Sequence, residues 1–155
     1  MNPKSPLSLD HQQLQKFQPN RYPFLLIDRV TECRPGAYAV GYKNFTNNEW
    51  FFPKHFPGNP NVPGVLQIEA MAQMLTVAIT TLPNLEGSVT HALEHHVRFR
   101  KEVFPGDRLD IVANVNSWRR GVCKGRVTGH VGDNLVCDAS MMITIPEILE
   151  SFLPR

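Results

Sequence analysis

Cysteines are few in this sequence, and it has neither a long apolar run nor a block of like charges. Cys33, Cys123 and Cys137 are odd in number, lie far apart and form no C-x-x-C pair, which favours reduced thiols over a disulfide framework. No apolar stretch approaches the roughly 20 residues of a membrane span, and the first residues lack the apolar core of a signal peptide. We therefore expect a cytoplasmic protein that does not cross a membrane.

The charge and length of the chain narrow its class further. The formal net charge of +2 is too small to indicate a nucleic-acid partner, and no basic block interleaved with aromatic residues is present. At 155 residues, with 42% hydrophobic and 19% charged residues, the chain has the size and composition of one globular domain. We expect a flexible tail at residues 1–8, which contain proline and serine, and a single domain at residues 9–155.

Much of the sequence alternates between apolar and polar residues as β-strands do. A short helix capped by Asp10 is expected to reach about Lys16. The segment 45–63 is loop-like, but its aromatic residues indicate that it packs against the domain. Strands are predicted at residues 24–33, 37–44, 88–99, 109–115, 123–131 and 135–145.

One long helix is predicted from Val65 to about Thr81, because Pro63 precedes it and Pro83 follows it. Apolar residues surround nearly its whole circumference, which indicates a buried helix. The order of elements predicts an α+β fold, in which a curled antiparallel sheet of about six strands wraps around the helix. The polar residues of the helix fall on one narrow stripe, which consists of Glu69, Gln73, Thr76 and Thr80.

His55 and Glu69, one before the helix and one within it, suit acid–base chemistry. A carboxyl group on a buried helix favours its neutral form when it has no partner, so Glu69 is a candidate general acid. His55 lies in a loop braced by prolines and is a candidate general base. The backbone amides of Gly64 and Val65 at the helix start are free to stabilise a carbonyl oxygen that gains negative charge.

An acid, a base and an oxyanion site together suit β-elimination or hydration at an acyl group. On spacing alone a second interpretation stays open, in which Glu69 is a hydrogen-bonded polar residue and His55 a loop residue bonded to backbone. No metal site is expected, because His95 and His96 point to opposite faces of a strand. We assign His91 and His130 to surface or packing roles.

The run from His55 to Gln73, HFPGNPNVPGVLQIEAMAQ, resembles the signature of the (3R)-hydroxyacyl-[acyl carrier protein] dehydratases of bacterial fatty-acid synthesis. Two further segments are similar to that family. They are RYPFLLIDRV at residues 21–30, and RFR at residues 98–100 followed by PGD at residues 105–107. The resemblance covers about residues 20–145.

This resemblance implies a hot-dog fold that works as a homodimer or a trimer of dimers, with active sites shared between subunits. His55 would be the base at C2, Glu69 would assist loss of the C3 hydroxyl, and the Gly64 amide would bind the thioester carbonyl. Gln73 would orient Glu69, and Val65 and Phe56 would lie near the substrate. The implied substrate is a 3-hydroxyacyl chain on acyl carrier protein, or on coenzyme A, and the product is a trans-2-enoyl thioester. No cofactor is implied.

Several positions bear on the substrate. Lys54 stands where the family usually has glycine, and Glu94-His95-His96 replaces a segment that more often contains aspartate near the gate of the acyl tunnel. Candidates for the tunnel wall, and equally for plain core, are Phe24, Phe56, Val65 and Met74. Candidates for a rim that meets an acidic carrier, or for solvated strand ends, are Arg98, Arg100, Lys101, Arg119 and Arg120.

Two other classes of function are alternatives to the dehydratase. A hot-dog thioesterase would hydrolyse the thioester with a helix carboxylate and water, and it would not need His55. A non-catalytic acyl-binding module is expected where the acid or the base has been lost, whereas this sequence has both.

Overall fold

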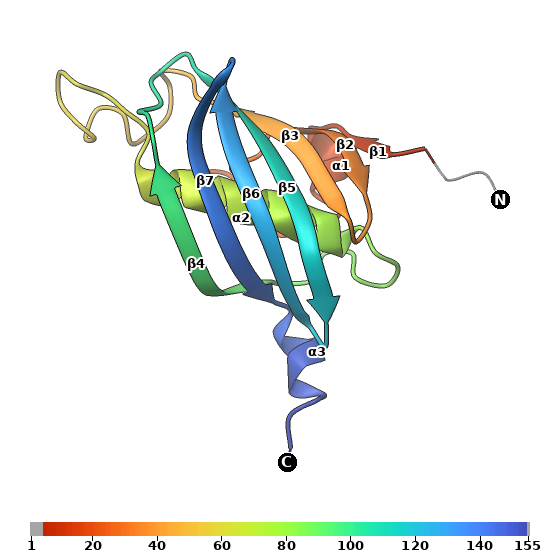
Figure 1. Cartoon of the computed structure of the whole chain (residues 1–155). Helices are drawn as coiled ribbons and strands as arrows, with labels where there is room; N and C mark the ends of the chain where they lie inside the picture. The colour runs from red at the N-terminus through yellow and green to blue at the C-terminus, as the bar shows by residue number, and fades with distance from the viewer. Residues whose placement is uncertain (1–4, 155) are drawn as a thin grey trace.

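The computed structural model describes residues 5–154, which form one antiparallel sheet of seven strands around a long helix. Figure 1 shows helix α2 (Gly64–Thr80) crossing one face of the sheet, while α3 (Pro146–Glu150) extends from its lower end. A four-residue helix, α1 (His11–Leu14), follows the first strand. This arrangement confirms the predicted α+β hot-dog fold. In chain order the strands are β1 (Leu7–Leu9), β2 (Arg29–Arg34), β3 (Tyr38–Asn44), β4 (His91–Phe99), β5 (Arg108–Arg119), β6 (Val122–Val131) and β7 (Asn134–Thr144).

Across the sheet the order is β1-β2-β3-β5-β6-β7-β4, so β1 and β4 are the two edges. Among the described residues, strand β4 pairs only with β7, in a register that sets Arg98 opposite Asp138 and His96 opposite Ser140. Within residues 5–154, no helix is long and apolar enough to cross a membrane.

Helix α2 is the centre of the core, as its apolar circumference predicts. From Ala70 to Thr80 every residue except Ala72 is buried, and the helix packs against the inner sides of β3, β5 and β6. The partly or fully exposed residues lie in its first half, at Gly64, Val65, Ile68, Glu69 and Ala72. One side of the helix start is therefore left uncovered by residues 5–154.

Two strand glycines let the sheet approach α2 closely. A Cβ atom on Gly125 would lie 2.5 Å from Leu75 Cδ1, and one on Gly41 would lie 2.8 Å from Met74 Cε. Both distances are shorter than van der Waals contact, so at these points side chains of the helix pack directly against the backbone of the sheet.

The structure differs from the sequence prediction at several places. The strand expected at residues 88–99 begins at His91, and the one expected at residues 109–115 continues to Arg119. The strand expected at residues 24–33 begins only at Arg29, because the backbone at Phe24 and Leu26 bonds the Gln73 side chain of α2 instead of a neighbouring strand. The expected tail at residues 1–8 is wrong for residues 7 and 8, since Leu7–Leu9 pair with β2; residues 1–4 lie outside the described part. Helix α3 was not predicted.

All three cysteines are free thiols buried in the core. Burial raises the pKa of Cys123 to about 12 and that of Cys137 to about 11, and it also raises the pKa of Cys33. At neutral pH these side chains therefore remain protonated packing groups.

Candidate active site

His55 lies in the loop between β3 and α2 and is held by the backbone on both sides. Its N–H donates to the Phe51 carbonyl at 2.9 Å, and its own carbonyl accepts from the Asn61 N–H at 2.9 Å. The imidazole Nδ1 lies 3.0 Å from the Asn61 carbonyl oxygen. Because a carbonyl only accepts, Nδ1 carries a proton in this bond, and the neutral ring keeps its lone pair on Nε2. Nε2 is therefore the atom that can take a proton.

Aromatic residues fix the base of this loop to the domain. Phe45, Phe51 and Phe52 are buried, and the Phe51 ring meets the other two edge-on at centroid distances of 6.2 and 4.7 Å. The tip is more open: the Phe56 ring stacks on His55 at 4.2 Å and is 53% exposed. The loop thus fixes the backbone at His55 and leaves the Phe56 ring beside it exposed to solvent.

Glu69 lies on the partly exposed side of α2, and its neighbour one turn on, Gln73, is buried. The Gln73 Nε2 donates to Glu69 Oε1 at 2.8 Å and to the Phe24 carbonyl at 2.7 Å. The Gln73 Oε1 accepts from the Leu26 N–H at 2.8 Å. Gln73 is thus fixed by the segment before β2, and it fixes the carboxylate of Glu69 in turn.

A second donor to Glu69 was missed at the sequence level. Asn20 Nδ2 lies 3.2 Å from Glu69 Oε1. Two amide groups thus donate to the same oxygen of Glu69: that of Gln73, which was expected to orient it, and that of Asn20, which was not expected. No periodic pattern marks Asn20, which lies in a loop and reaches Glu69 across 49 positions of sequence; its place directly before the RYPFLLIDRV segment is the one signal that points to it.

Gly64 is the first residue of α2, and the ring of Phe99 at the end of β4 covers it. A Cβ atom at this position would lie 2.7 Å from Phe99 Cζ. Pro63 provides no side-chain cap, and among residues 5–154 the amides of Gly64 and Val65 have no hydrogen-bond acceptor. Two N–H groups at the positive end of the helix are thus available to a carbonyl oxygen.

A cavity of about 490 Å³ opens beside this helix start. Gln67, which is 3% exposed, donates from Nε2 to the Val62 carbonyl at 3.2 Å, and its Oε1 has no partner among the described residues. The residues that line the cavity include Val62, Gly64, Gln67, Phe99, Arg100 and Lys101. A polar group is thus buried beside a cavity wall that contains Phe99 and Val62 and the charged residues Arg100, Lys101 and Glu102.

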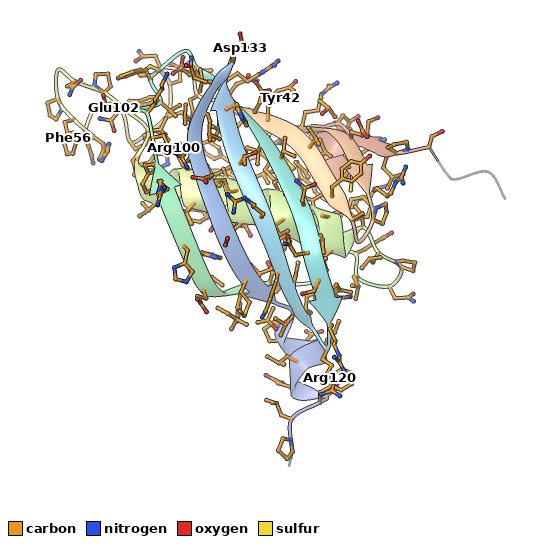
Figure 2. The ribbon with its side chains drawn as sticks, viewed as in Figure 1. Tyr42, Phe56, Arg100, Glu102, Arg120 and Asp133 are labelled. Carbon is orange, nitrogen blue, oxygen red and sulfur yellow. The ribbon has the colours of Figure 1, made fainter. Side chains whose placement is uncertain are left out.

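Within one chain, no hydrogen bond joins His55 to Glu69 among the described residues: the bonded partner of the His55 ring is Asn61, and those of the Glu69 carboxylate are Asn20 and Gln73. Figure 2 shows Phe56, the residue after His55, at the tip of a loop that projects beyond the sheet, past Arg100 and Glu102. The tip of the loop next to His55 thus extends away from the sheet.

The four candidates for a tunnel wall divide into two groups. Met74 is fully buried in the core. Phe24, Phe56 and Val65 are 47%, 53% and 71% exposed, which is high for large apolar side chains. Only these three are accessible to a ligand or a partner.

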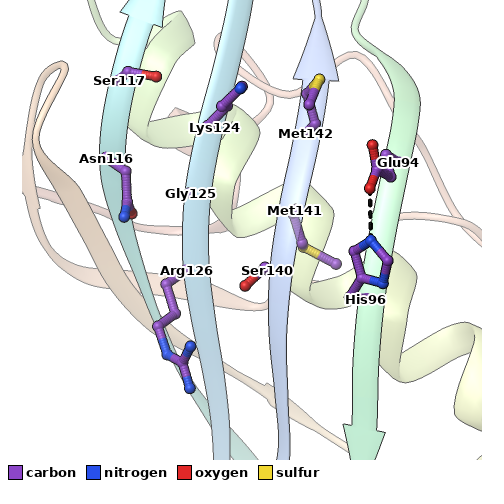
Figure 3. Close-up of a pocket in the computed structure, with 10 residues that line it drawn as sticks. All are labelled: Glu94, His96, Asn116, Ser117, Lys124, Gly125, Arg126, Ser140, Met141 and Met142. Atoms are coloured by element: carbon purple, nitrogen blue, oxygen red, sulfur yellow. Dashed lines mark hydrogen bonds and ion pairs between the residues drawn. The ribbon is translucent and has the colours of Figure 1, made fainter.

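The other histidines do not build a site in the described part of the chain. No group of three metal-ligating residues is found within residues 5–154. His96 Nε2 lies 2.6 Å from Glu94 Oε1, and both side chains are exposed. They border a shallow cavity of about 270 Å³ on the sheet face opposite α2, shown in Figure 3, so they lie apart from Glu69.

The five basic residues expected as one rim do not lie together. Arg100 and Arg120 are at opposite ends of the sheet (Figure 2). Arg100 donates to Asp138, at 3.2 Å from Nε to Oδ1, and this bond lowers the pKa of Asp138. Near the helix start, the charged residues are therefore Arg100, which is paired with Asp138, Lys101, which donates to Asn134, and Glu102.

Comparison with known proteins identifies the family to which the chain belongs. A family model described as "FabA-like domain" matches residues 18–140. The chain is 46% identical over 138 residues to the 3-hydroxyacyl-[acyl-carrier-protein] dehydratase FabZ of Desulforamulus reducens, a match that covers 88% of this chain and 97% of the relative. FabZ of Bacillus licheniformis is 44% identical over 140 residues, with 90% and 97% covered. The chain therefore belongs to the 3-hydroxyacyl-[acyl-carrier-protein] dehydratase family.

Solved structures agree on the fold. A chain of the dehydratase heterocomplex ApeI:P from Xenorhabdus doucetiae aligns with a TM-score of 0.75 at 16% identity, over 92% of this chain and 97% of that one. A hypothetical thioesterase with coenzyme A from Streptococcus pneumoniae aligns with a TM-score of 0.58 at 15% identity, over 75% and 83%. Because one of these similar folds belongs to a dehydratase complex and the other to a hypothetical thioesterase, the fold alone does not select a reaction.

Proposed function

We propose that His55 and Glu69 carry out the dehydration that defines this family, on the two sides of a site completed by the Gly64 and Val65 amides. The chain is a 3-hydroxyacyl-[acyl-carrier-protein] dehydratase, a hydro-lyase that converts 3-hydroxyacyl thioesters to trans-2-enoyl thioesters. The observation that carries the mechanism is the bond from His55 Nδ1 to the Asn61 carbonyl, which leaves Nε2 as a base.

The proposed reaction is a β-elimination. His55 Nε2 takes a proton from C2, and the thioester oxygen, as it gains charge, accepts hydrogen bonds from the Gly64 and Val65 amides. Glu69 gives its proton to the hydroxyl on C3, the C3–O bond breaks, and the electron pair of the former C2–H bond forms the double bond. Water leaves, and the proton on His55 is returned to Glu69 through solvent.

We propose that the working unit is a homodimer in which His55 of one subunit acts with Glu69 of the other. Three features of the chain support this: β4 is an edge strand without a second neighbour in the described part, the start of α2 is uncovered, and the His55 loop projects outward (Figure 1). Leu93 and Phe99 on β4 are 50% and 48% exposed and would be covered by a second copy. A trimer of such dimers is a compatible larger form.

The proposed partner is acyl carrier protein, whose prosthetic arm would enter beside Gly64, where two cations, Arg100 and Lys101, and one carboxylate, Glu102, border the cavity. Phe56 and Val65 are proposed to contact the substrate. A cytoplasmic location is proposed from the three buried free thiols. The thioesterase and the non-catalytic module are not favoured, because the relatives that match over most of the chain are dehydratases.

The test is a dehydration assay on a 3-hydroxyacyl-[acyl carrier protein], following enoyl absorbance together with free thiol. His55→Ala and Glu69→Gln are each expected to lower kcat by about 100-fold or more, because each removes a proton-transfer group, with an unchanged Tm. His11→Ala and Glu86→Gln, which alter exposed residues elsewhere, are the controls and should keep full activity. Full activity in either site variant would refute the assignment, and release of thiol would indicate a thioesterase.

A further inference from the structure

Glu69 receives both of its hydrogen bonds on one oxygen. Gln73 Nε2 lies 2.8 Å from Oε1, and Asn20 Nδ2 lies 3.2 Å from the same atom. Within residues 5–154, Oε2 has no hydrogen-bond partner. The two oxygens of this carboxyl group are therefore in different surroundings.

The direction of these bonds follows from the surrounding backbone. The Leu26 N–H donates to the Gln73 Oε1, so the Gln73 NH₂ group lies on the other side, where its two hydrogens reach the Phe24 carbonyl and Glu69. Asn20 faces a group that accepts, so its NH₂ end is the one turned to Glu69. Gln73 cannot turn its oxygen towards Oε1 without losing its bonds to Leu26 and Phe24.

Two donors on Oε1 determine which oxygen carries the proton. A proton on Oε1 would point at N–H hydrogens that are already bonded there, whereas Oε2 is free of them. The neutral acid therefore carries its proton on Oε2, and that oxygen is the one left open to a substrate hydroxyl.

Asn20 is itself held in place by the chain around it. The Arg21 guanidinium donates to three backbone carbonyls, at 2.7 Å to Gln18, 2.9 Å to Asn20 and 3.0 Å to Gln15. The Asn20 N–H lies 3.4 Å from the Gln18 Oε1, and Gln18 is 2% exposed. Arg21 thus ties the backbone at Asn20 to the end of the α1 segment, and this anchoring presets the amide before substrate arrives.

We propose that Asn20 is a positioning residue for Glu69: with Gln73 it occupies Oε1, so that the proton for the departing hydroxyl is delivered from Oε2. The inference rests on the proposed role of Glu69 as the acid and adds a residue outside the motif of helix α2. Asn20 does not need to touch the substrate to act in this way.

The first test is the kinetics of Asn20→Ala with the same acyl carrier protein substrate. The expected result is a fall of about tenfold in both kcat and kcat/KM with KM unchanged, because the lost hydrogen bond acts on a group used in the transition state. Asn20→Asp, which replaces the donor by a charged acceptor of the same size, should lose more. Asn116→Ala and Asn116→Asp, on the exposed sheet face opposite α2, are the matched controls and should leave both constants within about twofold.

The second test is coupling to Glu69. In Glu69→Asp the carboxylate is one methylene shorter and withdraws from Asn20, so adding Asn20→Ala to this variant should cost less than twofold further. An equal loss in both backgrounds would mean that Asn20 acts on the fold alone and would overturn the inference, as would a rise in KM with kcat unchanged. If Glu69→Gln is inactive while Asn20→Ala is fully active, the inference fails and the proposed function stands; full activity of Glu69→Gln would instead refute the proposed function.

Discussion

At the scale of single residues, the space at Gly64 decides how closely a substrate carbonyl can approach the helix start. The Phe99 ring already occupies the place of a side chain there, since a Cβ atom would lie 2.7 Å from Cζ. The ring and the free amides of Gly64 and Val65 form one surface. Any added atom must either displace the ring or stand over the amides.

Gly64→Ala should therefore separate activity from stability. Alanine is favoured over glycine in a helix by about 1 kcal/mol, so Tm should not fall much, whereas kcat/KM should fall by about tenfold or more because the carbonyl is held further from the amides. Steady-state kinetics and a thermal melt measure the two effects. Phe99→Ala in the same background restores space and should recover part of the loss; a fully active Gly64→Ala would contradict the oxyanion role.

The residues of the site were not equally accessible to sequence reasoning. His55, Gly64, Glu69 and Gln73 are close in sequence and follow a motif, so their identity could be predicted. Asn20 could not, because only the folded chain brings it to Glu69. The roles assigned to these residues remain predictions until the variants are measured.

At the scale of secondary structure elements, the contact between α2 and the inner side of β6 is set by the small size of Gly125. Leu75 Cδ1 would lie 2.5 Å from a Cβ atom there, and the Asn114 carbonyl oxygen 2.8 Å. The second neighbour is backbone of the adjacent strand and cannot rotate away. The position therefore has almost no tolerance for a larger residue.

Gly125→Ala is expected to destabilise the domain by about 1–3 kcal/mol, because the helix must move off the sheet to admit the methyl group. Equilibrium unfolding in urea gives the free energy of unfolding for both proteins. Ser140→Ala, on the exposed face of the neighbouring strand β7, is the control and should stay within about 0.5 kcal/mol of the parent. An unchanged midpoint in Gly125→Ala would show that α2 can shift at no cost.

Elements whose apolar residues recur with a clear period could be predicted from the sequence, whereas elements held by single contacts could not. Helix α2 and strands β3 to β7 follow from apolar patterning. The segment 24–27 has a strand-like composition, but its backbone groups bond Gln73, a side chain that no local pattern relates to it. Strand β1 has three residues, too few to show alternation.

At the scale of the whole molecule, the proposed active site is shared between two subunits, so mixing two inactive variants should restore activity. Each inactive variant retains one half-site: His55→Ala keeps Glu69, and Glu69→Gln keeps His55. After the two variants are mixed and allowed to exchange subunits, half of the dimers contain one of each, and such a dimer has one intact site. Activity should return to about a quarter of the parent value.

Either variant alone, carried through the same exchange procedure, is the control and should stay inactive. Mixing that restores no activity, although mass spectrometry shows mixed dimers, would place both groups of a site in one subunit. The result does not depend on the identity of the acyl chain.

The two edges of the sheet differ in a way that limits how copies can add to one another. Strand β4 offers nine residues to a neighbour, whereas β1 offers three and follows Pro6, which has no backbone N–H. Two copies joined at β4 consume each other's long edge and leave only short, proline-flanked ends. In the proposed dimer, growth by strand addition would therefore stop at two copies, and the long exposed edge of β4 would serve assembly without leading to fibres.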